Sequence, residues 1–397
     1  MERNTPPRRV AITGMGCISP LGANCADAAA ALREARDCVT PVAAFDVSGC
    51  KCRSAGQVND AWLRSAAALA PRARHWNRAS QMVLLATAEA LGGRADFRPD
   101  AVVIATTSGG MTFGESFHRM FQRGESLRRG AHWVREYLPQ QPVRDAMDFF
   151  GFDAPARIVS NACASGTNAL GMAFQLVRSG RARRVICGGY DALCQLVFAG
   201  FSSLQAATGE KCRPFDSGRT GLVLGEGAAI FLLEAAEEAA GEPLAEIAGY
   251  GASSDNHHLT QPNPDGSGPR RAMEAALADA GWSGVDYVNA HGTATPFNDA
   301  CEARALAEVC PRAPVSSTKG QMGHSLGAAG AIEAAFCVIS LRSGFLPANI
   351  HFRSPDEGVA LDIVANAVRA AAPRRVMSNS LGFGGANASL LLEAPRR

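Results

Sequence analysis

The stretch Ala156-Arg-Ile-Val-Ser-Asn-Ala-Cys163-Ala-Ser-Gly-Thr-Asn-Ala-Leu-Gly-Met-Ala-Phe-Gln-Leu-Val-Arg178 joins a short apolar run to a segment with helical periodicity. The pattern predicts a buried strand over 156–159, a turn of small residues, and a helix from Thr167 to Arg178. A cysteine in the first turn of a helix faces unpaired N–H groups and the positive end of the helix dipole, which lower the pKa of its thiol. We therefore expect Cys163 to be a nucleophile, although the chain has 12 cysteines and a cysteine is more commonly a small buried apolar residue.

Two histidines occur in similar turns further along the chain. His291 follows the apolar run Val285-Asp-Tyr-Val-Asn-Ala and begins the motif His291-Gly-Thr-Ala-Thr295. His324 ends the motif Lys319-Gly-Gln-Met-Gly-His324, which follows a second short apolar run. Residues at the ends of strands in an α/β sheet usually converge on a crevice. A single histidine in such a turn is more often structural, but two of them together with Cys163 predict one shared site.

The order of these motifs resembles that of the β-ketoacyl-acyl carrier protein synthases of the Cys-His-His class, the ketoacyl synthase II type within the thiolase-like superfamily. The resemblance extends from Arg9 to Asn387. One such motif would be weak support, whereas the ordered set is specific. The motifs are Asn161-Ala-Cys-Ala-Ser-Gly166, Arg213-Pro-Phe-Asp216, Gly225-Glu-Gly227, His291-Gly-Thr-Ala-Thr295, Lys319 to His324, and Gly382-Phe-Gly-Gly385.

The resemblance implies an α/β protein with a duplicated thiolase-like fold of five layers, α/β/α/β/α. Its N-terminal half, residues 1–240, would carry the nucleophilic cysteine. Its C-terminal half, residues 241–397, would carry both histidines and the Gly-Phe-Gly-Gly loop. The join is placed near Ala239-Ala-Gly-Glu-Pro243, where a Gly-Pro break interrupts the chain.

The resemblance also assigns a role to each candidate site residue. Cys163 would hold the acyl group, His324 would be the nearer partner of its sulfur, and His291 would be the main helper in decarboxylation. Lys319 would lie behind the histidines and bias their protonation. The backbone N–H groups of Cys163 and Phe383 would stabilise an oxyanion. The loop that moves with Phe383 would include Gly382, Gly384 and Gly385, and would pack beside a second loop that contains Asp255.

The resemblance extends to further positions. Thr293 and Thr295 would bind the phosphopantetheine arm, and Met111 would lie near the far end of the acyl pocket. Glu333 would belong to a buried polar network. Asp299 and Glu302 are interpreted as a structural capping box at the start of a helix. Arg219-Thr220-Gly221 departs from the family's usual Arg-Asp-Gly, which leaves the substrate open.

Composition decides little, but together with local sequence patterns it argues against several classes of protein. A formal net charge of +2 gives no strong case for nucleic-acid binding. The N-terminal residues lack the apolar core of a signal peptide, and we expect no membrane span and a cytoplasmic location. Cys50-Lys-Cys52 is too tight for a zinc site, and no metal or nucleotide is expected.

The basic run Arg181-Ala-Arg-Arg184 is interpreted as a solvated face, with contact to an acidic carrier protein as the alternative.

The resemblance implies a decarboxylative Claisen condensation. An acyl group on Cys163 would be extended with malonyl-acyl carrier protein, in fatty acid or in type II polyketide or polyene biosynthesis. Phosphopantetheine would arrive on the carrier protein. A dimer is expected, with an identical or a related chain, packed through the region from Arg184 to Leu193. The alternative is a non-elongating partner subunit that resembles a chain-length factor, in which the cysteine is typically lost. Cys163 argues against that alternative, and the loop at 382–387 lacks the second cysteine of degradative thiolases.

Overall fold

Strands β1 (Val10–Ile18) and β9 (Ala245–Ser254) lie side by side at the centre of a ten-stranded sheet. The computed structural model describes residues 7–239, 241–357 and 360–396. The strand order is β11-β10-β14-β15-β9-β1-β8-β6-β4-β5, so strands from before residue 240 form one half of the sheet and later strands form the other. The other strands are β4 (Ala101–Ala105), β5 (Ala156–Val159), β6 (Arg184–Asp191), β8 (Gly227–Ala235), β10 (Tyr287–Asn289), β11 (Val315–Ser316), β14 (Arg375–Gly382) and β15 (Ala386–Glu393).

The two halves of the sheet repeat the same pairing. In the first half β5, β4 and β6 are parallel, and β8 and β1 follow as antiparallel neighbours. In the second half β11, β10 and β14 are parallel, and β15 and β9 follow as antiparallel neighbours. The predicted duplicated α/β fold is therefore confirmed. The duplication makes β5 equivalent to β11, and the chain leads from these two strands to Cys163 and His324 respectively.

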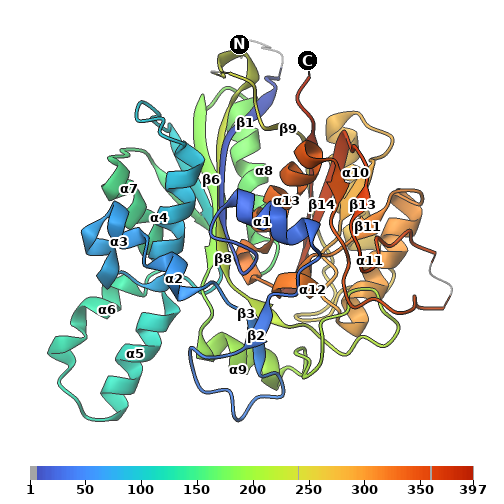
Figure 1. Cartoon of the computed structure of the whole chain (residues 1–397). Coiled ribbons are helices and arrows are strands. Elements are labelled where there is room, and N and C mark those ends of the chain that lie inside the picture. The colour runs from blue at the N-terminus through green and yellow to red at the C-terminus, as the bar shows by residue number, and fades with distance from the viewer. Residues whose placement is uncertain (1–6, 240, 358–359, 397) are drawn as a thin grey trace.

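Helices form three layers around the two half-sheets (Figure 1). Helices α8 (Ser165–Arg178) and α13 (Ala329–Ser343) contact each other and strands of both halves, so they form the central layer. Helices α4 (Arg78–Leu91) and α7 (Gln141–Phe150) pack outside the first half. Helices α10 (Ser267–Ala280) and α11 (Pro296–Val309) pack outside the second half. The result is the expected α/β/α/β/α layering.

Glycines let the N-terminal ends of α8 and α13 approach closely. A Cβ on Gly166 would lie 2.6 Å from the backbone nitrogen of Ala331, and a Cβ on Gly330 would lie 2.6 Å from that of Thr167. Such distances are too short for any side chain, so only glycine allows this crossing. The crossing brings the turn before α8, which contains Cys163, close to the turn before α13, which contains His324.

The shorter elements connect or cap these layers. Helices α5 and α6 project from the body of the molecule, and α9 with β2 and β3 lies at the end of the sheet opposite the two chain termini (Figure 1). The full set of connecting and capping helices and strands is α1 (Cys25–Arg33), α2 (Asp60–Leu63), α3 (Ala66–Leu69), α5 (Met111–Gln122), α6 (Ala131–Glu136), α9 (Gln195–Ser203), α12 (Lys319–Met322), β2 (Val39–Pro41), β3 (Ser54–Gly56), β7 (Leu224–Gly225), β12 (Phe345–Leu346) and β13 (Arg369–Ala370), among the residues that the structure describes.

The structure bears on three expectations about the fold: the dimer contact, the absence of a membrane span and the boundary between the two halves. The dimer was expected to pack through Arg184 to Leu193, but β6 lies between β4 and β8 and both of its edges are hydrogen-bonded. The apolar stretch Leu326–Ser343 does reach the length and hydropathy of a membrane span, yet 83% of it is buried in the protein core. The boundary at residue 240 falls on a position outside the described residues, between β8 and β9, and it stays a prediction.

Candidate active site

A cavity of about 320 Å³ is lined by residues from both halves of the chain, among them several that the sequence singled out. Cys163, His291 and His324 line it together with the loop at 382–385. Thr293, Thr295 and Asp255 also line it. Leu204 and Phe297 contribute exposed apolar side chains, with 53% and 60% of their surface accessible. The cavity therefore connects a buried Cys-His-His group with the surface.

Cys163 lies in a tight turn just before α8. Ala162 has a φ of 56°, a left-handed backbone that is unusual for alanine, and the Ser165 hydroxyl accepts a hydrogen bond from the Asn161 N–H at 2.8 Å. The helix begins at Ser165 and its N-cap is Ala164, so the cysteine lies before the first turn and not in it. Cys163 is 5% exposed, and the backbone N–H of Phe383 acts on its sulfur in the direction that lowers the thiol pKa.

Burial changes the expected ionisation of this cysteine. We expected the helix terminus to lower the thiol pKa, but burial raises the pKa of Cys163 to about 12, against a smaller lowering by the charge of Lys319. Burial therefore outweighs the expected influence of the helix terminus on the thiol pKa. A neutral thiol needs a nearby base to take its proton when it attacks.

The two histidine rings pack edge to face beside the sulfur. Their ring centroids are 5.2 Å apart with an interplanar angle of 84°, and Cys163 Sγ and a ring nitrogen of each lie within 4.8 Å of one another. Burial, followed by the positive charge of Lys319, holds the pKa of both imidazoles well below the ordinary value. Both rings are therefore neutral at pH 7, and each can accept a proton on one nitrogen and donate from the other.

The backbone of His291 is held by a carboxylate from α11. Glu302 accepts hydrogen bonds from the N–H groups of His291 and Gly292, both at 2.8 Å. Asp299 accepts in the same way from Thr293 and Ala294. Both acids lie within α11, which begins at Pro296, so they do not form the predicted capping box. They hold the turn that carries His291, and burial raises the pKa of Glu302 to about 7.

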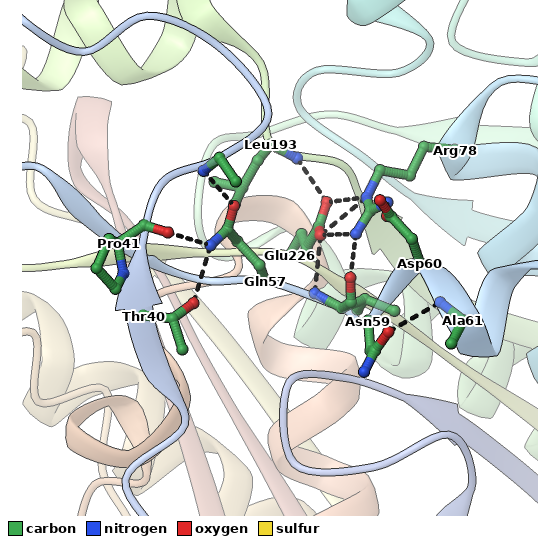
Figure 2. A network of polar contacts seen from close by, with 11 residues as sticks. Thr40, Pro41, Gln57, Asn59, Asp60, Ala61, Arg78, Leu193 and Glu226 are labelled. Carbon is green, nitrogen blue, oxygen red and sulfur yellow. Dashed lines mark hydrogen bonds and ion pairs between the residues drawn. The ribbon is translucent and has the colours of Figure 1, made fainter.

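The backbone of His324 is held by strands of the first half. Its N–H donates to the carbonyl of Val223 at 2.7 Å, and its own carbonyl accepts from the N–H of Gly225 at 2.8 Å. Glu226, the next residue, is 1% exposed and accepts from the N–H of Leu193 at 3.1 Å and from the Arg78 guanidinium (Figure 2). This network fixes the strand that flanks His324 to the end of β6.

A second buried carboxylate supports the same turn. Asp191, at the end of β6, accepts from the N–H of Gly327 at 2.7 Å and from the N–H of Ser108 at 2.7 Å. It also accepts from the hydroxyls of Thr106 and Thr107. Leu326 has a left-handed φ of 54°, so the turn after His324 needs such external hydrogen bonds. Asp191 thus ties the His324 turn to the 106–108 turn.

Lys319 and Glu333 form a buried ion pair beside the histidines. The ammonium group contacts Oε1 of Glu333, and the two side chains are 1% and 3% exposed. Lys319 begins α12 and Glu333 lies in α13. The charge of Lys319 is close enough to affect the histidines and the cysteine.

Comparison with known proteins agrees with this geometry. Residues 7–239 match the family described as "Beta-ketoacyl synthase, N-terminal domain", and residues 244–353 match "Beta-ketoacyl synthase, C-terminal domain". The chain belongs to the β-ketoacyl synthase family. The 3-oxoacyl-[acyl-carrier-protein] synthase 2 of Staphylococcus aureus strain COL is 35% identical, over 97% of this chain and 98% of its own.

Two solved structures share the whole fold of this β-ketoacyl synthase. The ishigamide ketosynthase/chain length factor has a TM-score of 0.90 and 32% identity, and covers 98% of this chain and 99% of its own. A type II polyketide synthase ketosynthase in complex with its acyl-carrier protein, bound to the hexaketide, has a TM-score of 0.87 and 26% identity. That likeness covers 98% of this chain and 100% of the matched chain.

The loop around Phe383 closes one side of the β-ketoacyl synthase cavity. The Gly384 N–H donates to the carbonyl of Leu259 at 2.7 Å, and Asp255 N–H donates to the carbonyl of Gly385 at 2.9 Å. Gly384 and Gly385 have φ angles of 78° and 77°, which favour glycine. The Phe383 ring stacks on Phe201 of α9 at 5.6 Å. The two loops that the resemblance paired are thus in contact.

Thr293 and Thr295 also line the cavity. Their hydroxyls are 2.9 Å apart. The Arg219 guanidinium holds this segment by donating to the carbonyls of Thr295 at 3.2 Å and Pro296 at 3.0 Å. It also pairs with Asp356 at 2.7 Å.

Some residues at this site were missed, and one predicted residue lies elsewhere. Sequence reasoning did not single out Phe201, Asp191 or the supporting role of Glu302, because their contacts join segments far apart in the chain. Met111 begins α5 and is not among the residues that line this cavity, so its place in an acyl pocket stays a prediction. Arg183 and Arg184 pair with Glu238 and Glu234 while their side chains stay 70% and 40% exposed, which favours the interpretation of that basic run as a solvated face.

Proposed function

We propose that this β-ketoacyl synthase condenses an acyl group held on Cys163 with a malonyl group on acyl carrier protein, and releases a β-ketoacyl thioester and CO2. The observation that carries the proposal is the meeting of Cys163 Sγ with a ring nitrogen of each of two neutral histidines, all within 4.8 Å, beside the N–H of Phe383. A nucleophile, two imidazoles and a backbone donor in one cavity are the groups that acyl transfer followed by enolate formation requires.

The first step loads the acyl group. The neutral thiol of Cys163 gives its proton to the imidazole of His324 as sulfur attacks the carbonyl of the incoming acyl thioester. The oxyanion that forms is stabilised by the N–H groups of Cys163 and Phe383. The intermediate collapses, the bond to the carrier sulfur breaks, and the carrier thiol takes up the proton. The acyl group is then a thioester of Cys163.

The second step forms the carbon–carbon bond. The malonyl carboxylate leaves as CO2, and the electron pair of the broken bond moves into an enolate of the thioester. N–H donors on His291 and His324 stabilise the enolate oxygen. The enolate carbon attacks the acyl carbonyl on Cys163, and the sulfur leaves as a thiolate that regains a proton. Neutral imidazoles suit this role because a charged imidazolium at rest would require solvation that the buried site does not provide.

The substrates would arrive on the phosphopantetheine arm of an acyl carrier protein. The cavity supplies the hydroxyls of Thr293 and Thr295 on one wall, and amide groups of the arm need such partners. The ketosynthase at 26% identity is solved with its acyl-carrier protein, which supports the same kind of partner here. This chemistry fits fatty acid biosynthesis and also polyketide or polyene biosynthesis. A cytoplasmic location stays a prediction.

A dimer would form through the free edge of the sheet. Strand β5 ends the strand order, and its residues Ala156 and Arg157 are exposed. An unpaired edge strand offers N–H and C=O groups to a second chain. The mate would be an identical chain or a related one, as in the ketosynthase/chain length factor structure. A non-elongating partner role is the second candidate, and the intact Cys-His-His group disfavours it.

Acyl transfer to the purified chain tests the proposal. The chain is incubated with saturated and polyunsaturated acyl carrier thioesters, and its intact mass is recorded. We expect a gain of one acyl group, followed by release of the β-ketoacyl product when malonyl carrier protein is added. If no donor acylates the chain, alone or with a co-purified ketosynthase-like partner, the condensation proposal fails and the partner-subunit role is favoured.

Replacing either histidine should affect decarboxylation selectively. We expect His291→Ala and His324→Ala each to lower CO2 release from malonyl carrier protein by ~10²–10³-fold, the usual cost of removing one oxyanion donor. His118 is exposed on α5, so His118→Ala is the matched control and should keep its activity. Equal CO2 release from all three variants would contradict the assignment.

A further inference from the structure

The three groups at the bottom of the cavity are also potential metal ligands. Cys163 Sγ and a ring nitrogen of each of His291 and His324 lie within 4.8 Å of one another. Sulfur from cysteine and nitrogen from histidine are the donors that Zn²⁺ prefers, at about 2.3 Å and 2.0–2.1 Å. Ligands that surround one tetrahedral ion lie roughly 3–4 Å apart by these bond lengths, so small rotations of the side chains would complete the arrangement.

The imidazole nitrogens are available for such an ion. Nδ1 of His291 and both ring nitrogens of His324 are buried and have no hydrogen-bond partner among the residues that the structure describes. A ring nitrogen without a partner can bind a metal ion without breaking an existing contact. It also gains from doing so, because a buried polar atom without a partner is unfavourable.

The cavity gives an ion both a route and a fourth ligand. It connects Cys163 and the histidines with the exposed residues Leu204 and Phe297 at its mouth, and its volume of about 320 Å³ has room for several waters. Three protein ligands with one open position are typical of zinc sites that exchange ligands, whereas structural zinc sites are closed by four protein ligands.

We propose that Cys163, His291 and His324 form an inhibitory binding site for a thiophilic divalent cation of the Zn²⁺ class. On binding, the thiol of Cys163 releases its proton to solvent and a sulfur–metal bond forms. One nitrogen of each histidine and one water fill the remaining positions. The bound ion holds the sulfur that must attack an acyl thioester and the imidazoles that must assist, so it blocks acyl transfer.

The surroundings indicate a reversible site and not a resident cofactor. Metal-binding histidines usually donate their second N–H to a carboxylate or a carbonyl, and loss of such a partner weakens binding by ~10–100-fold. Both ring nitrogens of His324 lack a protein partner of that kind among the described residues. The ammonium of Lys319 adds a positive charge nearby, although it is paired with Glu333. We therefore expect a chelator to remove the ion and restore activity.

Cobalt provides a direct readout that does not depend on the proposed reaction. The reduced, chelator-treated chain is titrated with Co²⁺, and the thiolate-to-cobalt charge-transfer band in the near ultraviolet is recorded. We expect one equivalent to saturate the band and Zn²⁺ to remove it by displacement. The band should be absent from Cys163→Ala. In His291→Ala and His324→Ala the apparent affinity for Co²⁺ should be at least ~10-fold weaker. Zn²⁺ should also slow alkylation of Cys163 by iodoacetamide.

Matched variants separate this site from other thiols and histidines. Cys310 is as buried as Cys163, at 4% against 5% exposed, and Cys310→Ala should keep the full band. His257 and His258 are exposed and lie in the chain between the lining residues Asp255 and Thr260, and His257→Ala/His258→Ala should also keep the band. A full band in Cys163→Ala, a band that requires His257 and His258, or no band in the wild-type chain would each overturn the proposal. Wild-type chain alkylated at Cys163 should give no band, which guards against a misfolded variant.

Discussion

Cys163→Ala is expected to lower the turnover of condensation by at least ~10⁴-fold while the fold is retained. The reason is that no other group in the cavity can carry the acyl chain as a thioester. Alanine fits the site because the cysteine is 5% exposed in a turn of small residues, and the substitution removes only one sulfur atom. The measurement is β-ketoacyl product formed from acyl and malonyl carrier proteins, with thermal unfolding recorded in parallel.

The same variant should separate the two half-reactions. Decarboxylation depends on the histidines and the malonyl thioester, so Cys163→Ala should still release CO2 from malonyl carrier protein although it makes no condensation product. Cys310→Ala is the matched control, since it removes an equally buried sulfur outside the cavity, and it should retain condensation. Condensation by Cys163→Ala at more than a hundredth of the wild-type rate would show that another residue holds the acyl group.

The sequence predicted the parts of this site that lie on local motifs. Cys163, His291 and His324 each follow a short apolar strand in a turn of small residues, and the convergence of strand ends brought them together as expected. The duplicated fold was predicted through the family resemblance that the ordered motifs carry. Motif order along the chain was therefore enough to place the reacting groups.

Contacts between distant segments could not be predicted in this way. Asp191 hydrogen-bonds Gly327 across 136 residues, and Glu226 contacts Arg78 across 148. No local pattern marks a carboxylate as the acceptor for a remote turn. The edge strand β5, which we propose as the dimer contact, was also missed. In the sequence β5 and β6 both appear as short apolar runs, and only the pairing order shows that β5 lies at an edge of the sheet.

The ionisation of Cys163 shows a second limit of sequence reasoning. The helix terminus was expected to lower the thiol pKa, and the position of the cysteine relative to α8 was predicted to within two residues. Burial nevertheless dominates and raises the pKa to about 12. The extent of burial depends on the opposite half of the fold, including the Gly382 loop, where a Cβ would lie only 3.2 Å from the Cys163 nitrogen. The sequence of one turn contains no such information.

Lys319→Met is expected to lower the free energy of unfolding by about 3–5 kcal/mol at pH 8, because it leaves the carboxylate of Glu333 buried without a counter-charge. Burial already raises the pKa of Glu333 above its ordinary value, and loss of Lys319 removes the main influence that lowers it. A carboxyl group whose pKa is raised in the folded state favours that state when the pH is below its unfolded pKa, near 4.5. This contribution is lost as the pH rises through the folded-state pKa. The loss should therefore be larger at pH 8 than at pH 5, as measured by denaturant unfolding.

The double variant Lys319→Met/Glu333→Met separates stability from catalysis. Replacing both members of a buried pair by apolar side chains of similar size is often neutral, so most of the lost stability should return. Activity should behave differently, because the charge of Lys319, and not that of Glu333, contributes to the low pKa of His291 and His324. Without that charge the histidines protonate more easily, and the acid limb of the decarboxylation profile should move to higher pH in both the single and the double variant. An unchanged acid limb in the stable double variant would show that Lys319 acts only through its ion pair with Glu333.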